Sequence, residues 1–345
     1  MMVNRTAMLK VGILGASGFV GAELLRLLAA HPSIQATRFF GDSRAGKTLV
    51  DVHPHLALAY GGARFELYSA EALDGLDLVF AALPHGHSQD IAGEIIARGL
   101  KFVDLGADFR LDSAETYKRW YGEDHKAPEL LDRFVYGIPE LHREQIRTAQ
   151  CVAAAGCYPT SAILALKPLV DAGLVDTDSI VVDAASGVSG AGRGLKDETH
   201  FNTIAENFTA YGLLGHRHTA EMEQGLGATV LFTPHLLPTN RGILATCYGK
   251  ASGAMDKDAP LNALLAAYAD EPFVHASDRP PSTKWTLGSN AVHVTARYDE
   301  RTGRVLTIAA LDNLVKGAAG QMIQCANLMC GFDEAAGLSI VGVYP

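Results

Sequence analysis

The sequence has no paired cysteines. Five cysteines are scattered over 345 residues without a CxxC pair, at positions 151, 157, 247, 325 and 330. An odd and dispersed set excludes a disulfide framework and the usual spacing of a zinc site, and it is typical of a reducing compartment. We therefore expect a cytoplasmic protein with free thiols and no metal.

Long apolar runs, a leader and an excess of basic residues are also missing. No uninterrupted apolar segment is long enough to span a bilayer, and residues 1–6 lack the apolar core and cleavage site of a signal peptide. Acidic residues outnumber basic ones by 38 to 29, which gives a net charge of −9 and argues against nucleic acid or an anionic membrane as the partner. We expect a protein that acts on a small molecule.

The length and the pattern of apolar segments indicate two closely packed domains. In the first half, apolar strands at 10–14, 35–40, 76–83 and 101–105 alternate with helices, which predicts a Rossmann-type, doubly wound parallel sheet. From residue 179 onward, β-rich runs predict an α+β domain with a mixed sheet for catalysis and oligomerisation. An apolar helix after 317 is expected to return to the first domain. The predicted boundaries are therefore 1–156 with 314–345, and 157–313.

A glycine-rich turn follows the first strand. Gly15-Ala16-Ser17-Gly18-Phe19-Val20-Gly21 has GxxGxxG spacing and precedes an amphipathic helix. Glycines let the backbone turn sharply and approach a pyrophosphate at the helix N-terminus. This arrangement predicts a dinucleotide site, with a purely structural turn as the alternative.

The end of the second strand should meet the adenosine ribose. Asp42 there would suit a free 2′-hydroxyl, whereas Ser43, Arg44 and Lys47 would suit a 2′-phosphate. We favour NADP(H); a solvated charged loop is the alternative. Farther along, Arg110 follows the strand at 101–105, where it either clamps an anionic substrate group or pairs with Asp108.

Cys157 lies where a short apolar strand ends and a helix begins. The helix is predicted from Pro159 to Leu169, because proline and threonine suit its first turn. The positive end of the helix dipole favours a thiolate over a thiol. Cys157 is therefore a candidate nucleophile, and a buried structural cysteine is the alternative.

Two further segments of the second half carry candidate chemistry. Residues 186–194 form a glycine-rich loop after a strand, which indicates an anion-binding nest or else a flexible linker. In His216-Arg217-His218, Thr219 is expected to cap a helix beginning at Ala220, which leaves His218 outside the helix start as a candidate acid/base. A metal site at this pair lacks a third ligand of recognisable spacing.

Together these motifs resemble the phosphorylating semialdehyde dehydrogenases, and within them the N-acetyl-γ-glutamyl-phosphate reductase family, over essentially the whole chain. The motifs that carry the resemblance are residues 15–21, 104–110, 156–160 (Gly-Cys-Tyr-Pro-Thr, the most specific), 186–193, 216–218 with Glu221, 234–242 and 312–317. The chain departs from the family pattern at Ala155 and Ala220, where proline is usual. Both changes alter backbone stiffness and leave the chemistry intact.

The resemblance implies an oxidoreductase of arginine biosynthesis that reduces N-acetyl-γ-glutamyl phosphate with NADPH through a cysteine thioester. It implies Cys157 as the nucleophile, His218 as the acid/base, and a homo-oligomer, either a dimer or a tetramer. The implied cofactor contacts are Gly15, Ser17, Gly18, Phe19, Val20, Ser43, Arg44, Ser186, Gly187 and Asn313. The implied substrate contacts are Arg110, His216, Ser189 and Gly190.

Other functions share parts of this pattern. Aspartate-semialdehyde dehydrogenase and a reductase of carrier-bound aminoadipyl phosphate have the same layout, but Gly-Cys-Tyr-Pro-Thr and the histidine segment favour the N-acetylglutamyl family. A dinucleotide-binding redox sensor without turnover would carry the nucleotide fingerprint without a paired cysteine and histidine. His216 and His218 lie two residues apart, so their roles could be exchanged.

Overall fold

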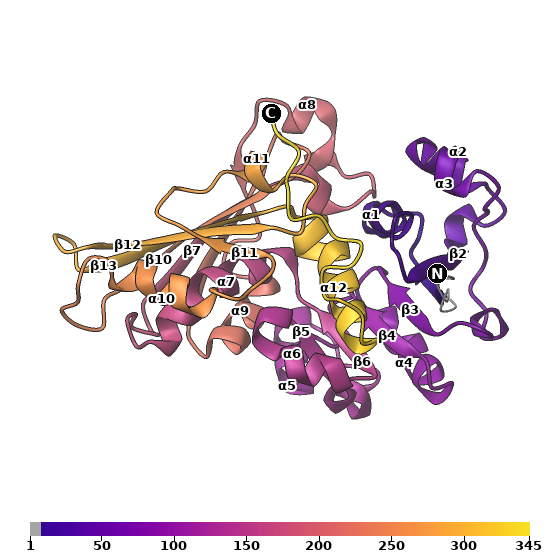
Figure 1. Ribbon diagram of the computed structural model, residues 1–345, viewed down its shortest axis with the longest axis horizontal. Coiled ribbons are helices and arrows are strands. Elements are labelled where there is room, and N and C mark those ends of the chain that lie inside the picture. The colour runs from indigo at the N-terminus through magenta and orange to yellow at the C-terminus, as the bar shows by residue number, and fades with distance from the viewer. Residues whose placement is uncertain (1–7) are drawn as a thin grey trace, which may run out of the picture. The chain divides into compact units, whose positions relative to one another are not determined.

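The computed structural model describes residues 8–345. The start of the chain, on which the expectation of no signal peptide rests, lies outside the described residues. By its contacts the chain divides into two compact units (Figure 1). The first unit comprises residues 8–118, 123–155 and 318–338, and the second comprises 119–122, 156–317 and 339–345.

The first unit contains a six-stranded sheet in which every pairing is parallel. Its strand order is β2-β1-β3-β4-β6-β5. The strands are β1 Leu9–Leu14, β2 Ile34–Phe40, β3 Leu78–Ala81, β4 Lys101–Asp104, β5 Phe134–Gly137 and β6 Cys151–Ala154. All residues of β3 and β6 are buried, as expected for strands covered by helices on both faces. The predicted Rossmann-type sheet is confirmed.

Helices connect these strands and cover the sheet. The longer ones are α1 Phe19–Leu28, α4 Ser88–Ala97, α5 Ala114–Tyr121, α6 Pro139–Thr148 and α12 Gly320–Met329. Short turns of helix lie between them: η1 Asp42–Arg44, α2 Leu49–Val52, η2 Pro54–Leu56, α3 Ala57–Tyr60, η3 Glu71–Leu73 and η4 Pro128–Arg133. Every residue of α12 is buried, and it packs against α6, α1 and three strands of this unit.

The second unit contains a seven-stranded mixed sheet of order β11-β12-β13-β10-β7-β9-β8. The pairs β7/β9 and β11/β12 are parallel and the others antiparallel. Its strands are β7 Ile180–Gly187, β8 Thr209–Ala210, β9 Val230–Leu237, β10 Ile243–Lys250, β11 Val274–Ala276, β12 Val292–Asp299 and β13 Arg304–Leu311. This confirms the predicted mixed sheet; the two short edge strands were not predicted.

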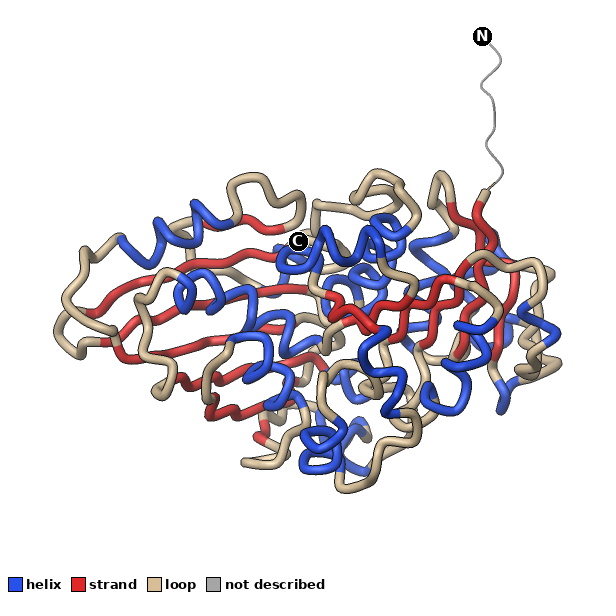
Figure 2. The backbone as a smooth tube through the Cα atoms, turned by 90° about the horizontal axis from the view of Figure 1, so that it is seen from below, coloured by secondary structure: helices blue, strands red, loops and turns tan. Residues whose placement is uncertain are grey.

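One face of this sheet is packed against helices. Figures 1 and 2 show α7, α9 and α10 on the same side of the strands, and these helices contact β10, β9 and β12. Along β9 and β10 the residues alternate between buried and more exposed, so one set points to the helices and the other points away. The helical segments of the unit are α7 Cys157–Asp171, η5 Val188–Ala191, η6 Asp197–Thr199, α8 Phe201–Ile204, α9 His218–Leu226, α10 Ala259–Ala267, α11 Thr283–Thr286 and η7 Val315–Ala319.

Two predicted helix starts differ from the structure. Helix α7 begins at Cys157 itself, two residues before Pro159, and continues through Pro168. Helix α9 begins at His218 after Arg217, and no side chain caps it, so the prediction of a Thr219 cap is wrong. The N–H of Thr219 instead donates to the carbonyl of His216, because the turn before the helix is already wound.

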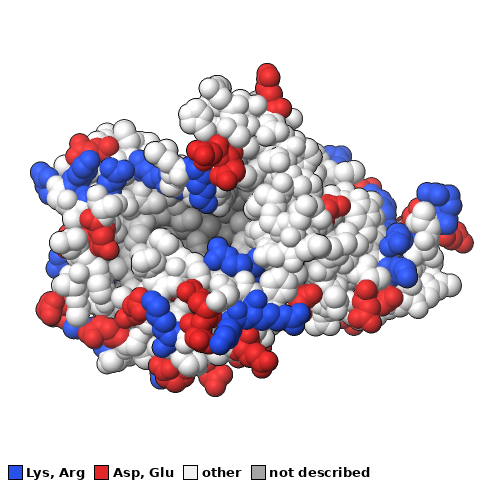
Figure 3. All heavy atoms as spheres, turned by 180° about the vertical axis from the view of Figure 1, so that it is seen from behind, with Lys and Arg blue, Asp and Glu red and all other residues white. Residues whose placement is uncertain are grey.

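The surface carries both signs of charge. On the face drawn in Figure 3, lysine and arginine side chains are interspersed with aspartate and glutamate and form no continuous basic surface. Within residues 8–345, no helix is long and apolar enough to cross a bilayer.

Candidate active site

Cys157 is the first residue of α7, directly after β6 and Gly156. Gly156 is extended (φ −66°, ψ 155°), and no side chain caps the helix. The first backbone N–H groups of α7 therefore point out of the N-terminal end of the helix without a side-chain acceptor. Cys157 forms no disulfide, and its thiol is partly exposed. The terminus of α7 thus combines an accessible sulfur with hydrogen-bond donors and the positive end of a helix dipole.

The other cysteines lie in less reactive surroundings. Burial raises the pKa of Cys151 to about 12 and that of Cys330 to about 11. Burial also raises the pKa of Cys247 far above its ordinary value, and Cys325 is fully buried. Among the five thiols, Cys157 is the one placed at a helix start.

A buried carboxylate connects His218 with the cysteine turn. His218 Nε2 lies 3.9 Å from Glu221 Oε1, one turn along α9. Glu221 Oε2 accepts the N–H of Gly156 at 2.9 Å, and the Glu221 side chain is fully buried. A carboxylate beside an imidazole orients the ring and stabilises its charged form. No role was predicted for Glu221, although its position three residues after His218 puts the two side chains on the same face of a helix.

His216 lies in an aromatic cluster. Its ring makes edge contacts with Tyr158, Tyr211 and Phe232 at centroid distances of 5.9, 5.5 and 5.3 Å. Burial, aided by the charge of Arg217, lowers the pKa of His216 to about 4, so the ring is neutral at pH 7. Its Nδ1 accepts the N–H of His218 at 3.2 Å, which fixes the proton on Nε2.

Two tyrosines join this cluster to the helix of Cys157. The hydroxyl of Tyr158 donates to the carbonyl of His235 at 2.8 Å, and that of Tyr211 donates to Tyr158 at 3.3 Å. Burial raises the pKa of Tyr211 to about 12 and that of Tyr158 further, so both phenols stay protonated. Tyr211 was missed in the sequence, where it stands in an unremarkable loop.

The predicted nest at 186–194 comprises the last two residues of β7, all of η5 and the three residues after it. Asn313 connects this loop with the residue just before β10: its Oδ1 accepts the N–H of Gly242 at 2.8 Å, and its Nδ2 donates to Ser189 Oγ at 2.9 Å. A side chain at Gly187 would lie 2.7 Å from the backbone nitrogen of Arg241. The second unit therefore brings together one set of predicted site residues: Cys157, Ser186, Gly187, Ser189, Gly190, His216, His218 and Asn313.

The glycine fingerprint begins at the end of β1 and leads into α1. Gly15 has φ +76°, and a Cβ there would lie 2.3 Å from the carbonyl oxygen of Ala82. A Cβ at Gly21 would lie 2.5 Å from the Gly15 carbonyl, so both positions require glycine. Gly18 precedes α1, and no side chain caps this helix. Backbone N–H groups at the start of α1 can therefore donate to the pyrophosphate of a dinucleotide.

The residues predicted to choose the cofactor follow β2. Ser43 and Arg44 belong to the exposed turn η1. Gly41, just before η1, approaches the fingerprint so closely that its Cβ would lie 3.3 Å from that of Ser17. The first unit therefore holds the other set of predicted site residues: Gly15, Ser17, Gly18, Phe19, Val20, Ser43, Arg44 and Arg110.

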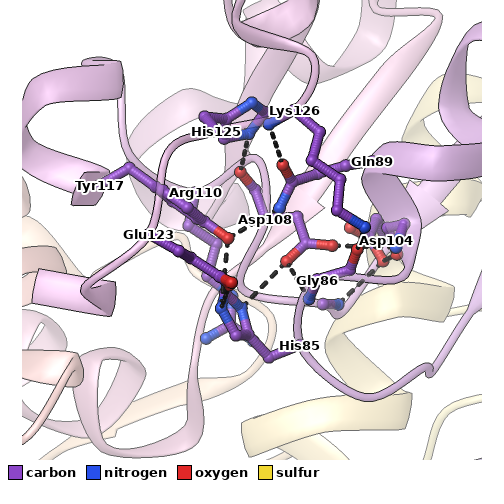
Figure 4. Close-up of polar contacts among 12 residues, drawn as sticks. His85, Gly86, Gln89, Asp104, Asp108, Arg110, Tyr117, Glu123, His125 and Lys126 are labelled. Carbon is purple, nitrogen blue, oxygen red and sulfur yellow. Dashed lines mark hydrogen bonds and ion pairs between the residues drawn. The ribbon is translucent and has the colours of Figure 1, made fainter.

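Arg110 lies in a polar cluster after β4 (Figure 4). It is buried, and its Nη2 donates to the carbonyl of Leu105 at 2.6 Å. Asp108 accepts the N–H groups of Gly86 and Ser88 at 2.7 and 2.9 Å. Although burial opposes its ionisation, these bonds and a contact with His85 keep the pKa of Asp108 below its ordinary value. Asp108 is thus an ionised carboxylate that holds the loop after β3.

Metal chemistry has no visible site in the described part of the chain. Residues 8–345 contain no group of three or more histidine, cysteine, aspartate or glutamate side chains that could hold a metal ion.

Comparison with known proteins identifies the class to which this chain belongs. Residues 10–149 match the family model of the semialdehyde dehydrogenase NAD binding domain, and residues 157–313 match that of the semialdehyde dehydrogenase dimerisation domain. The solved aspartate semialdehyde dehydrogenase II of Vibrio cholerae has the same fold, with a TM-score of 0.71 at 19% identity over 94% of this chain and 99% of that one. An NADP-bound aspartate semialdehyde dehydrogenase of Candida albicans gives 0.62 at 17% identity, covering 94% and 99%. The fold and domains define an oxidoreductase of the semialdehyde dehydrogenase class.

Curated relatives identify the family within that class. An N-acetyl-gamma-glutamyl-phosphate reductase of Pelotomaculum thermopropionicum is 48% identical over 97% of this chain and 99% of its own. One from Desulforudis audaxviator is 47% identical over 98% and 100%. The chain belongs to the N-acetyl-gamma-glutamyl-phosphate reductase family. The resemblance seen in the sequence is confirmed.

Proposed function

We propose that this enzyme reduces N-acetyl-γ-glutamyl phosphate to N-acetylglutamate 5-semialdehyde and phosphate, as a step of arginine biosynthesis, through a thioester on Cys157. The observation that carries the proposal is Cys157 at the open N-terminus of α7, with the His218–Glu221 pair joined to the same turn. The names of the relatives support the choice of substrate.

The cysteine step follows from this geometry. The sulfur of Cys157 attacks the acyl carbon, the carbon–oxygen bond to phosphate breaks, and the phosphate leaves with the bonding electrons. The oxyanion that forms lies within reach of the N–H groups at the start of α7. NADPH, when bound, supplies a hydride to the thioester carbon. The carbon–sulfur bond then breaks to give the aldehyde, and the thiolate of Cys157 is restored.

His218 manages the proton in this scheme. It accepts the thiol proton when Cys157 attacks. When the carbon–sulfur bond breaks and the aldehyde leaves, it returns that proton to the Cys157 sulfur. Glu221 stabilises the protonated ring across the 3.9 Å contact. Neutral His216 presents its Nε2–H as a donor to substrate, and the predicted role of Arg110 is to bind the phosphate.

The cofactor is NADP(H), and the first unit fits it. The crowded positions of Gly15 and Gly21 allow the backbone to approach a pyrophosphate at the start of α1. The exposed turn η1 offers Ser43 and Arg44 to a 2′-phosphate. In the second unit, Ser186, Gly187 and Asn313 complete the proposed cofactor contacts, and Ser189 and Gly190 contact the substrate.

We also propose that the enzyme is a homo-oligomer built on the open face of the second unit's sheet. The dimerisation-domain match covers this unit. Leu231 on β9 and Tyr248 on β10 point away from the helices and are 49% and 36% exposed. A second copy that packs on this face would bury these two apolar side chains.

An NADPH-oxidation assay with two acyl phosphates tests the proposed activity. We expect N-acetyl-γ-glutamyl phosphate to be reduced with a kcat/KM at least about a hundredfold above that for aspartyl phosphate, because the pocket must bury the acetyl group and the longer chain. Cys157→Ala serves as the background control. Preference for aspartyl phosphate, or no oxidation with either substrate, would refute the assignment.

A further inference from the structure

A histidine in the first unit bridges two carboxylates beside Arg110 (Figure 4). His85, in the loop after β3, places Nδ1 3.0 Å from Asp108 Oδ1 and Nε2 3.0 Å from Glu123 Oε1. Asp108 is fully buried, whereas Glu123 is 54% exposed. Carboxylate oxygens only accept hydrogen bonds, so a ring facing one at each nitrogen makes both contacts only as an imidazolium.

The buried side of this bridge organises two loops. The Asp108 carboxylate accepts the N–H groups of Gly86 and Ser88, so it ties the loop after β3 to the loop after β4. Arg110 follows two residues later in the second of these loops. Removing a partner from a buried carboxylate leaves the charge uncompensated, which costs far more than losing a contact at the surface.

The exposed side of the bridge has two alternative partners. Tyr117 Oη lies 3.2 Å from His85 Nε2 and accepts the amide N–H of Gln89 at 2.7 Å. Unlike the Glu123 carboxylate, a phenol can donate. When the ring loses a proton and keeps Nδ1–H on Asp108, Nε2 becomes an acceptor for the Tyr117 hydroxyl, and the contact with Glu123 is released.

Other charged groups surround the bridge without touching His85 in these contacts. Buried Asp104 lies close enough to Asp108 for their charges to interact, and Lys126 also acts on Asp108. His125 Nε2 lies 2.7 Å from the backbone carbonyl of Asp108. The bridge is therefore part of a dense charged cluster. Within it, His85 is the imidazole that directly contacts the Asp108 carboxylate.

We propose that His85 is a positioning residue for phosphate binding: as an imidazolium between Asp108 and Glu123, it holds the loop that presents Arg110 to the phosphate of the substrate. The proposal rests on the proposed function, in which Arg110 binds that phosphate. It assigns His85 no contact with the reacting atoms.

Two substitutions separate the two halves of the bridge. The amide nitrogen of asparagine takes roughly the place of Nδ1, so His85→Asn keeps a donor for Asp108, whereas His85→Gln places its donor toward Glu123. We expect His85→Gln to raise the KM for the acyl phosphate and the Kd of inorganic phosphate about tenfold or more, in the range of a lost charge-assisted bond. The kcat and the rate of Cys157 alkylation should change little, and His85→Asn should restore most of the phosphate affinity.

The control is His87→Gln. His87 lies two residues on in the same loop, is exposed, and makes no side-chain hydrogen bond or ion pair within residues 8–345. This variant should match wild type in phosphate affinity. Unchanged phosphate affinity in His85→Gln, or an equal loss in His87→Gln, would overturn the proposal.

Glu123→Gln tests how phosphate affinity depends on the protonation of His85. Because Glu123 is at the surface, this variant can also be used if His85→Gln fails to fold. Measuring the Kd of inorganic phosphate for wild type and variant at each pH, and taking their ratio, cancels the titration of phosphate itself. The wild-type advantage should be present at low pH and disappear as His85 loses its proton. A ratio that stays flat with pH would contradict the proposal that the protonated ring contacts Glu123.

Arg110→Ala separates this proposal from the proposed function. If Arg110→Ala leaves phosphate affinity unchanged, the proposed role of Arg110 is wrong. If Arg110→Ala weakens phosphate affinity but His85→Gln does not, only the role of His85 is wrong.

Discussion

Single residues carry the chemistry, and their surroundings set the protonation states. Burial holds the pKa of His216 to about 4, so this ring is neutral across the usual assay range, while His218 lies beside a buried carboxylate. The choice between the two histidines, open in the sequence, now has a structural argument. His218 alone of the pair has a carboxylate partner that favours a charged ring.

Substitution of the two histidines should therefore give different results. His218→Asn should lower kcat by about 10² to 10⁴-fold, the usual contribution of an acid/base residue. It should also remove the limb of the pH–rate profile that reports an imidazole near neutrality. His216→Asn should act mainly on KM and keep that limb, because a ring with a pKa of about 4 does not titrate there. Exchange of these two results would make His216 the base.

Arg44 is predicted to select NADP(H) over NAD(H). Because η1 is exposed, Arg44→Ala should leave the fold intact and remove one charge-assisted contact to the 2′-phosphate. We expect the Kd of NADPH to rise about ten- to a hundredfold, with little change for NADH, as measured by fluorescence titration. An equal loss for both cofactors would mean that η1 does not contact the 2′-phosphate.

Most candidate residues could be recognised from the sequence because each lies at a predictable boundary between a strand and a helix or loop. Cys157 and Gly18 lie where a strand passes into a helix, and local residue types indicate such boundaries. Glu221 and Tyr211 could not be assigned in this way. Their partners, Gly156 and Tyr158, are 65 and 53 residues away, and only the tertiary fold brings them together.

At the scale of elements, the close approach of η7 to α7 determines where the thiol sits. A Cβ at Gly317 would lie 2.8 Å from the Cβ of Cys157, so the two segments meet through a position without a side chain. The sequence marked residues 312–317 as a motif but offered no reason for the glycine. The reason is this backbone approach, which periodicity does not report.

A methyl group at this contact should therefore disturb the nucleophile. Gly317→Ala should destabilise the protein by about 1–3 kcal/mol through overpacking, and it should displace Cys157. The rate of Cys157 alkylation by iodoacetamide and kcat should both change. Gly253, which has open space around its Cα and no positive φ, provides the control, and Gly253→Ala should behave as wild type. Normal thiol reactivity in Gly317→Ala would show that the contact does not position the cysteine.

Strand and helix assignments succeeded where a segment had a clear period or a strong boundary. The core strands β7, β10, β12 and β13 all lie in the β-rich part of the chain that was predicted from residue 179 onward. The edge strands β8 and β11, with two and three residues, are too short for any period to show. The start of α9 was misplaced because Thr219 resembles a cap, whereas Arg217 already adopts helical angles.

At the scale of the whole molecule, the open sheet face of the second unit predicts assembly. Leu231→Asp would place a charge in the proposed interface, so this variant should shift the protein toward the monomer in size-exclusion chromatography with light scattering. Leu265 on α10, 44% exposed on the helical side, offers a matched control. Leu265→Asp should keep the wild-type mass. Unchanged mass in Leu231→Asp would place the interface elsewhere.

The covalent role of Cys157 is the central claim, and mass spectrometry tests it most directly. The enzyme is mixed with N-acetyl-γ-glutamyl phosphate in the absence of NADPH, quenched in acid and digested. We predict an N-acetylglutamyl group on the peptide that contains Cys157, with release of about one equivalent of phosphate per active site. Cys157→Ala should show neither the adduct nor the release. NADPH oxidation by Cys157→Ala at near wild-type rate, or an adduct on another residue, would contradict the account.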